Sequence, residues 1–248
     1  MSTEVFQRHE IKYLLNPMQR AFLCKALEEY MVPDPHGEST ICNVYYDTPD
    51  YRLIRRSLEK PVYKEKIRIR SYGACQPEDS IFLELKKKYD GVVYKRRIEI
   101  KEKDAVSFLQ GTAPLPADSQ IAREIQYFCQ FYGPLEPAVH LCYDRCAYYS
   151  KTDPDLRITF DQNIRWEKTH LSLTDLPKGK DLLEPKQSLL EIKTASALPL
   201  WLTRALSEAK IHPVSFSKYG TVYQTGLYPH PVSIPKHYPV ESRGYIYV

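Results

Sequence analysis

Glycine is scarce in this sequence: its 248 residues include nine glycines and nineteen prolines. Neither GxGxxG nor GxxxxGK followed by Ser or Thr occurs, and these are the glycine-rich loops with which Rossmann and P-loop proteins cradle phosphates. If the chain performs chemistry on nucleotides, it must therefore hold the phosphate groups with side chains.

Long apolar runs are absent as well. No stretch approaches the roughly 20 apolar residues that a membrane-spanning helix needs. The start MSTEVFQRHEIKYLL has polar residues where a signal peptide carries its apolar stretch. We therefore expect a cytoplasmic protein with no membrane partner.

The cysteines follow no known ligand pattern. They form no CxxC pair and no Cys/His spacing suited to zinc. Because a reducing compartment keeps thiols free, free thiols are favoured over disulfides or a metal site. The six residues are Cys24, Cys42, Cys75, Cys129, Cys142 and Cys146.

Charge and composition are those of an ordinary globular protein. Lysine and arginine number 35 against 31 acidic residues, and this net charge of +4 is too small to indicate a nucleic-acid partner. The hydrophobic fraction is 43% and the charged fraction 27%, and the length suits one domain over residues 1–248. Residues 226–248 are rich in proline and tyrosine, and we expect them to form an extended C-terminal tail on the body.

The periodicity of apolar residues predicts an α+β fold with few helices and many strands. Helices are expected at 16–30, with Asn16 as N-cap, at 104–111, at 118–132, with Asp118 as N-cap and Gly133 as stop, and at 198–210. Strands are expected at 6–14, 41–47, 62–72, 81–89, 92–101, 139–149, 156–166 and 189–193. Asp90-Gly91 predicts a tight hairpin turn between two long antiparallel strands.

The polar faces of these strands are unusually cationic. In residues 66–70 the alternate positions Lys66, Arg68 and Arg70 share one face, with isoleucines on the other. Like charges spaced about 6.6 Å apart along a strand repel one another, so an anion is expected over them. Glu84, Lys86 and Lys88 continue this pattern on the next strand.

The same pattern recurs on the remaining strands. The in-phase sets are Arg8, Glu10 and Lys12; Tyr143 and Arg145; Arg157, Thr159, Asp161 and Arg165; and Glu191 and Lys193. If the apolar faces pack outward against helices, the charged faces look inward. The sequence thus predicts a closed antiparallel β-barrel with a polar lumen and with helices packed outside.

A lumen with excess cations needs a polyanionic guest, because unpaired buried charges cost several kcal/mol each. Phosphate oxygens suit arginine and lysine, and Glu191 and Glu10 could hold Mg²⁺ or Mn²⁺ through oxygen ligands. One Glu-x-Lys pair alone is usually a solvated ion pair. Their joint occurrence on several strands favours a ligand site.

Several ordered motifs support a family resemblance. They are Arg8-x-Glu10-x-Lys12-Tyr13, Tyr45-Tyr46-Asp47-Thr48, Lys66-x-Arg68-x-Arg70, Glu84-x-Lys86, Tyr143-x-Arg145-x-x-Tyr148, Arg157 to Asp161, Glu191-x-Lys193 and Ser217-Lys218-Tyr219-Gly220. Together they resemble the VTC domain, the catalytic domain of the vacuolar transporter chaperone complex and its stand-alone prokaryotic relatives, within the triphosphate tunnel metalloenzymes of the CYTH-like superfamily. The resemblance covers residues 4 to about 225.

This resemblance implies a tunnel barrel that binds ATP or another triphosphate with Mn²⁺ or Mg²⁺. In the best-known members it makes inorganic polyphosphate from ATP. By position it implies catalytic roles for Arg68, Arg70, Lys86, Arg145 and Lys218. It implies substrate binding by Lys12, Lys66, Glu84, Tyr143, Arg157, Lys193 and Ser217, and metal binding by Glu191 and Glu10.

One departure separates the possible activities. The triphosphatase branch carries ExExK near its start, whereas Arg8 replaces the first acid here, which favours a polymerase over a triphosphatase. A noncatalytic module that binds polyphosphate or RNA is a third hypothesis. The sequence contains no SPX domain or membrane segment of the kind that accompanies the eukaryotic polymerase, so coupled translocation of product is not expected.

Overall fold

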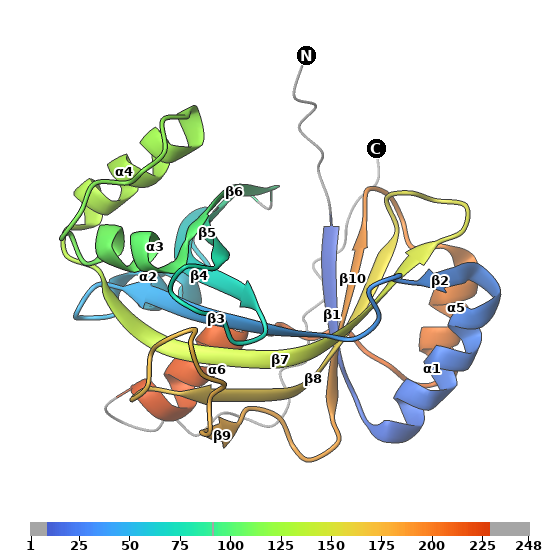
Figure 1. The fold of residues 1–248 in the computed structure, drawn as a ribbon. Coiled ribbons are helices and arrows are strands. Elements are labelled where there is room, and N and C mark those ends of the chain that lie inside the picture. The colour runs from blue at the N-terminus through green and yellow to red at the C-terminus, as the bar shows by residue number, and fades with distance from the viewer. Residues whose placement is uncertain (1–8, 91, 229–248) are drawn as a thin grey trace.

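The computed structural model of the chain describes residues 9–90 and 92–228, and its body is a ten-stranded sheet with antiparallel pairings (Figure 1). The strands are β1 (His9–Leu15), β2 (Met31–Pro33), β3 (Ser39–Asp47), β4 (Tyr63–Tyr72), β5 (Ser80–Tyr89), β6 (Val92–Lys101), β7 (Glu136–Ser150), β8 (Arg157–Glu167), β9 (Lys180–Asp181) and β10 (Ser188–Thr194). Their order is β1-β10-β8-β7-β3-β4-β5-β6, with β2 beside β7 and β9 beside β8.

The first four helices lie between strands in the chain, and the others follow the last strand, β10. They are α1 (Pro17–Tyr30), α2 (Arg52–Leu58), α3 (Glu102–Leu109), α4 (Gln120–Tyr132), α5 (Leu200–Glu208) and α6 (Lys218–Val222), followed by the π-helical turn η1 (Tyr223–Leu227). Among the described helices, none combines the length and apolar character that a bilayer-spanning segment requires.

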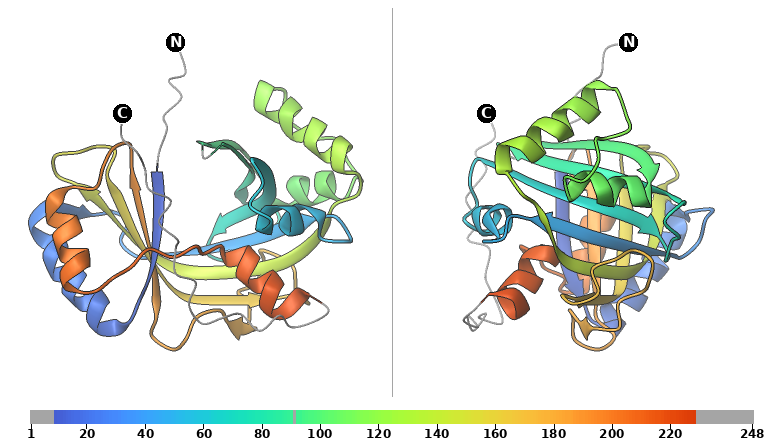
Figure 2. Two further views of the ribbon diagram at one scale, coloured as in Figure 1. Left: turned by 180° about the vertical axis from the view of Figure 1, so that it is seen from behind. Right: turned by 60° about the vertical axis from the view of Figure 1, so that its left-hand side comes forward.

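The sheet bends into a U rather than a hydrogen-bonded barrel (Figures 1 and 2). Its edge strands are β1 and β6, and no backbone pairing joins them within residues 9–90 and 92–228. Lys86 Nζ lies 3.7 Å from Glu10 Oε2 and so links β5 to β1 through side chains. The expected antiparallel sheet with external helices is confirmed, whereas the expected closure by strand pairing is not found.

Strand alternation gives this sheet an apolar outer face. Ile67, Ile69, Leu83 and Leu85 are fully buried there and pack in one core cluster with side chains of α3 and α4. A second cluster joins α1 and α5 to the outer side of β1, β10 and β8. Each such buried side chain contributes about 1.5–3 kcal/mol, so the helices hold the curved sheet from outside and leave its polar face inward.

A third cluster places α6 on the inner face. The ring of Tyr219 stacks on Tyr45 of β3 with centroids 4.9 Å apart. The hydroxyl of Tyr219 donates to the buried carboxylate of Asp47, which also accepts from the backbone N–H groups of Leu53 and Ile54 in α2. One buried aspartate thus fixes both short helices to the end of β3.

Most predicted elements are confirmed, and their ends show local capping chemistry. Asn16 caps α1 by accepting from the N–H of Gln19 at 2.9 Å. In α4 the cap is Ser119, which accepts from Ala122, and not the expected Asp118. The sequence analysis missed α2 and α6, because helices of five to seven residues have too few turns to show an apolar stripe.

The C-terminal tail and the single-domain boundaries remain expectations. Residues 226–227 end the π-helical turn η1 and are not extended, and the tail from residue 229 onward lies outside the described residues.

The expectation of free thiols is wrong for one pair. Cys42 of β3 and Cys142 of β7 form a disulfide. The strand register sets them directly opposite each other, although 100 residues separate them in the chain. Cys24, Cys75, Cys129 and Cys146 are free.

Candidate functional site

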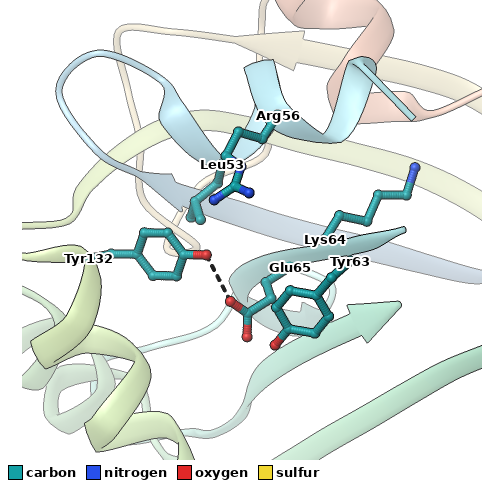
Figure 3. A pocket seen from close by; sticks show the side chains of 6 residues that line it. All are labelled: Leu53, Arg56, Tyr63, Lys64, Glu65 and Tyr132. Carbon is teal, nitrogen blue, oxygen red and sulfur yellow. Dashed lines mark hydrogen bonds between the residues drawn. The ribbon is translucent and has the colours of Figure 1, made fainter. Parts of the chain in front are cut away.

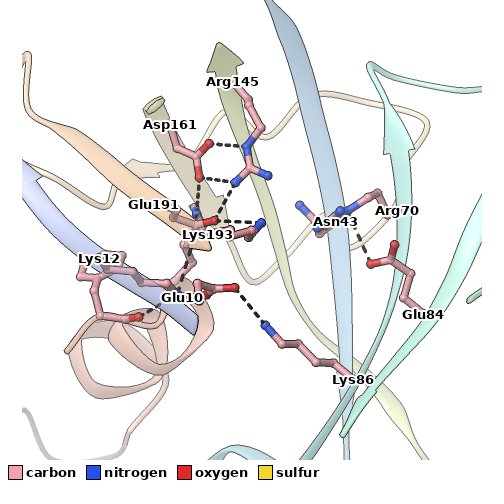
Figure 4. Close-up of polar contacts among 12 residues, drawn as sticks. Glu10, Lys12, Asn43, Arg70, Glu84, Lys86, Arg145, Asp161, Glu191 and Lys193 are labelled. Carbon is pink, nitrogen blue, oxygen red and sulfur yellow. Dashed lines mark hydrogen bonds and ion pairs between the residues drawn. The ribbon is translucent and has the colours of Figure 1, made fainter. Parts of the chain in front are cut away.

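Charged side chains from seven strands and α6 converge on the inner face, and Figure 4 shows most of them pointing toward one another. We call this set the inner cluster. Its cations are Lys12, Lys66, Arg68, Arg70, Lys86, Lys95, Arg145, Lys193 and Lys218, and its carboxylates are Glu10, Glu84, Asp161 and Glu191. Nine cations therefore face four carboxylates.

The most buried part of the inner cluster is built around Asp161 on β8. Arg145 of β7 binds this carboxylate through two hydrogen bonds, from Nε at 2.6 Å and from Nη2 at 2.7 Å. Lys218 of α6 donates to Asp161 and, at 3.3 Å, to Glu191. Although burial lowers the pKa of Lys218, the two carboxylates outweigh it, so the pKa rises and the ammonium stays charged.

Asp161 is the main residue that the sequence analysis did not assign. Its alternation with Arg157 and Thr159 placed it on the polar face, and its strand opposes the strand of Arg145. Its place on the polar face was the signal in the sequence, whereas its pairing with Arg145 follows from the strand topology. Asp161 is fully buried and holds two of the predicted catalytic cations in place.

Glu191 and Glu10 lie diagonally across the β1–β10 pairing, in which Glu10 is opposite Lys193 and Glu191 is opposite Lys12. Lys12 Nζ is 3.1 Å from Glu10 Oε1 and 3.6 Å from Glu191 Oε1. Burial raises the pKa of Glu10, but Lys86 and Lys12 together lower it to about 2. The pKa of Glu191 is likewise held well below its usual range, with burial opposed by Lys218, Lys12 and Arg145. Both groups are therefore carboxylates at neutral pH.

Glu84 on β5 holds the arginines of β4. Its Oε2 accepts from Arg68 Nη2 at 2.7 Å and lies 3.7 Å from Arg70 Nε, and Lys95 of β6 pairs with its other oxygen. Arg70 also donates to Asn43 at 2.9 Å, and Arg68 to Tyr45 at 2.7 Å. The sequence analysis did not assign Asn43, Tyr45 or Lys95.

Within the described residues, Lys66 is the one cation of the inner cluster that has no carboxylate partner. Its Nζ donates to the hydroxyl of Ser217 at 3.0 Å, and no carboxylate lies within 4.0 Å of it in residues 9–90 and 92–228. Burial, followed by Lys64, Lys12 and Lys86, lowers its pKa to about 7. An anion bound here would restore the charge on Lys66.

Tyr143 and Ser217 both contact cations of the inner cluster, through a ring face and a hydroxyl respectively. Lys218 Nζ lies 4.4 Å from the centroid of the Tyr143 ring, and the Arg145 guanidinium carbon lies 5.2 Å from it. The tyrosine therefore supports two cations with its ring face. Ser217 caps α6 by accepting from Gly220 and also accepts from Lys66.

Two expected residues lie outside the inner cluster. Arg157 sits at the end of the inner face, partly exposed, with its Nη2 3.9 Å from Asp34. Arg165 was expected in phase with Asp161, but its register partner is Cys142, on the outer side. A bulge at Asn163, whose φ is 47°, reverses the alternation after Asp161. Arg8 lies outside the described residues.

Oxygen donors are present for a hard divalent cation. Glu191 and Glu10 supply carboxylate oxygens. The hydroxyl of Thr159, directly opposite Glu191 in the β8–β10 register, is buried and has no hydrogen-bond partner among the residues that the structure describes. Oxygen ligands of this kind suit Mg²⁺ and Mn²⁺. These residues therefore fit a divalent metal that is also bound by a phosphate group.

Two pockets lie apart from the inner cluster. One has a volume of about 230 Å³ and lies between α4 and the outer side of β4 and β5, with Glu65, Lys87 and several aromatic rings in its wall. Figure 3 shows the adjoining pocket, where Tyr132 donates to Glu65 at 2.8 Å. No residue that the sequence analysis assigned to the site lines either pocket.

Comparison with known proteins agrees with this arrangement. Vacuolar transporter chaperone complex subunit 4 of Schizosaccharomyces pombe is 24% identical over 286 residues, an alignment that covers 94% of this chain and 39% of that protein. The same subunit of Trypanosoma brucei brucei is 26% identical over 210 residues, covering 66% of this chain and 26% of that protein. The chain thus spans well under half the length of these relatives.

A solved structure shares the fold. The crystal structure of a "putative adenylate cyclase" from Bacillus halodurans superimposes with a TM-score of 0.52 at 14% identity, covering 85% of this chain and 95% of that one. The VTC domain family itself matches residues 7–226, nearly the whole described structure. The resemblance seen in the sequence is therefore confirmed, and the chain belongs to the VTC domain family.

Proposed function

We propose that the protein is a polyphosphate polymerase, which transfers the γ-phosphate of ATP to a growing inorganic polyphosphate chain on the inner face. The excess of nine cations over four carboxylates in the inner cluster carries this proposal. A chain of phosphates matches such a surface, because it supplies many negative charges in a row. The subunit 4 relatives support the family context, and the activity of this chain is our proposal.

In this mechanism the side chains bind and orient, and no side-chain nucleophile is needed. Arg68, Arg70, Lys86, Arg145 and Lys218 neutralise the charge that develops on the transferred phosphoryl group and on the leaving diphosphate. The terminal phosphate of the polymer attacks the γ-phosphorus in line. Glu84 and Asp161 keep the arginines in position through the hydrogen bonds described above.

The remaining residues hold the substrate on either side of the reacting group. We assign this role to Lys12, Lys66, Tyr143, Lys193 and Ser217, with Arg157 at the edge. Glu191 and Glu10 would hold Mg²⁺ or Mn²⁺. The metal would supply Lewis-acid charge neutralisation to phosphate oxygens.

Incubation of the protein with γ-labelled ATP and Mn²⁺ or Mg²⁺, followed by separation of long chains from free phosphate, tests this function. Labelled chains support polymerase activity. Free phosphate alone identifies a triphosphatase, and the absence of both products identifies a noncatalytic polyphosphate- or RNA-binding module. Arg96→Gln is a matched control, because Arg96 pairs with Glu124 on the outer face.

A further inference from the structure

The inner face has two chemically different ends. Residues at every second position share this face, which on β4 gives, in order, Lys64, Lys66, Arg68, Arg70 and Tyr72. On β5 the facing series runs from Lys88 through Lys86 and Glu84 to Phe82. The nine residues from Lys64 to Tyr72 span about 26 Å. One end of this length is thus formed by lysines and the other by aromatic rings.

The aromatic end consists of Tyr72, Phe82, Tyr149, Arg97 and Arg157. The rings of Tyr72 and Phe82 meet edge to face, with centroids 6.2 Å apart. The guanidinium of Arg97 lies 4.2 Å from the centroid of Phe82, and that of Arg157 lies 4.8 Å from Tyr149. Tyr72 is 60% exposed, so its ring is available to a ligand.

The contacts of Tyr149 fix the far side of this end. Its hydroxyl donates to Asp34 at 2.9 Å, and the same carboxylate lies 3.9 Å from Arg157. These contacts hold the ring and the guanidinium together. The aromatic end is therefore a set of flat rings, with one guanidinium over a face of Phe82 and another over a face of Tyr149.

Among the described inner-face residues, the lysine end offers no exposed ring, because Tyr45 and Tyr219 beside it are stacked on each other and buried. Lys64 donates to the backbone carbonyl of Ser57, and Lys66 donates to Ser217. Lys64, Lys66 and Lys88 lie near one another, and none of them has a carboxylate within 4.0 Å in the described chain. These ammonium groups can bind phosphates as point charges but offer nothing on which a base can stack.

A nucleoside triphosphate has the same polarity as this face. Its base is a flat aromatic group that stacks on tyrosine, phenylalanine and arginine, whereas its phosphates prefer cations. An inorganic polyphosphate has no base and gains nothing from the rings of the aromatic end. The two ends of this face therefore suit different parts of the donor, and only the donor has a base that can use the aromatic rings.

We propose that the nucleoside of the donor stacks at the aromatic end on Tyr72, Phe82 and Tyr149, and that the phosphate polymer extends toward Lys64 and Lys88. This inference rests on the proposed function. The transfer breaks the bond between the β–γ bridging oxygen and the γ-phosphorus and forms one between a terminal polymer oxygen and the same phosphorus. The nucleoside diphosphate then leaves past the aromatic end, and the polymer is longer by one phosphate on the lysine side.

Calorimetric titration with ATP, inorganic tripolyphosphate and long-chain polyphosphate at constant ionic strength tests this polarity. Tripolyphosphate is the decisive probe, because it carries three phosphates and no base. The variants are Tyr72→Ser at the aromatic end and the double variant Lys64→Gln/Lys88→Gln at the other. Tyr127→Ser is the matched control, since Tyr127 is an exposed aromatic residue on α4.

Tyr72→Ser is expected to weaken ATP binding about five- to tenfold and tripolyphosphate binding less than twofold. The lysine variant is expected to weaken long-chain polyphosphate binding at least fivefold and ATP binding less than twofold. Equal losses for ATP and tripolyphosphate in Tyr72→Ser, or an unchanged ATP affinity, would overturn the polarity alone. Wild-type protein that binds none of the three ligands would overturn the proposed function and this inference together.

Discussion

Two regions of the inner face hold their charges in opposite ways. Around Asp161 each buried cation already has a carboxylate partner, and Arg145 is held by two hydrogen bonds. Around Lys66 the cations face one another, and a serine hydroxyl replaces the missing anion. Removing the central carboxylate, Asp161, from the first region should therefore damage the fold, whereas removing the charge of Lys66 from the second should affect ligand binding.

The largest expected effect is on stability, in Asp161→Ala. This substitution leaves Arg145 and Lys218 buried beside a lost partner, which costs about 3–5 kcal/mol. Chemical denaturation monitored by circular dichroism measures the loss. Asp118→Asn, in an exposed pair with Arg123, is the control and should change stability by less than about 1 kcal/mol. Equal effects in both variants would show that Asp161 contributes no more to stability than an exposed ion pair.

Glu191→Gln and Arg70→Ala come next and act on turnover. Each removes a charge assigned to the reacting phosphates or the metal, so kcat should fall about 10²- to 10³-fold. Product formation from labelled ATP measures this, with circular dichroism to establish that the variants are folded. Glu124→Gln, on the outer face, should keep wild-type turnover. Near-wild-type rates for Glu191→Gln or Arg70→Ala would refute the assigned roles.

The affinity of Lys66→Met for tripolyphosphate should depend on pH differently from that of the wild type, with a difference of about tenfold in Kd. Because the pKa of free Lys66 is about 7, wild-type protein must take up a proton to bind an anion at pH 8.5, and its affinity for tripolyphosphate should fall as pH rises above 7. Calorimetry at pH 8.5 in buffers of different ionisation enthalpy measures the uptake. The methionine variant should show weaker binding and lose this uptake. Unchanged uptake would assign it to another group.

Lys66 also affects the stability of the free protein, with a definite sign. Its pKa in the folded state lies below the usual 10.5, so the folded protein binds fewer protons than the unfolded chain between these two values. The resulting penalty is fully present below pH 7 and disappears as pH rises toward 10.5. The free energy of unfolding should therefore rise with pH between about 7 and 10.5 in the wild type, and Lys66→Met should lack this rise.

Ser217→Ala is expected to have the smallest effect. It removes the N-cap of α6 and the acceptor of Lys66, which should lower stability by about 1 kcal/mol. Thermal unfolding measures the change. Ser217→Thr keeps the hydroxyl and should restore most of the lost stability. Failure of this rescue would show that the hydroxyl is not what matters.

The features of the fold that depend on residues close together in the sequence could be predicted. Period-two alternation located the long strands, and it also set which residues share the inner face, as with Lys66, Arg68 and Arg70. Alternation fails wherever the backbone departs from a regular strand. The bulge at Asn163 places Arg165 on the outer side of the sheet, and no pattern in the preceding residues predicts that change.

Long-range pairing is the part that alternation cannot supply. Cys42 and Cys142 meet because β3 and β7 are neighbours in one particular register. Asp161 meets Arg145 for the same kind of reason, and its partner Lys218 arrives on a helix too short to predict. Burial of the charges was foreseeable from the strand faces, whereas the choice of partners depended on topology.

The edges of the sheet, which are unpaired within the described residues, bear on how the polymer that we propose as substrate would reach the inner face. In the described structure, β1 and β5 are linked at this seam by Lys86 and Glu10, whose side chains are 44% and 24% exposed. Partly exposed ion pairs contribute at most about 1 kcal/mol, so thermal motion separates them readily. Such a polymer can then enter laterally through this seam, and neither of its ends has to be threaded along the inner face.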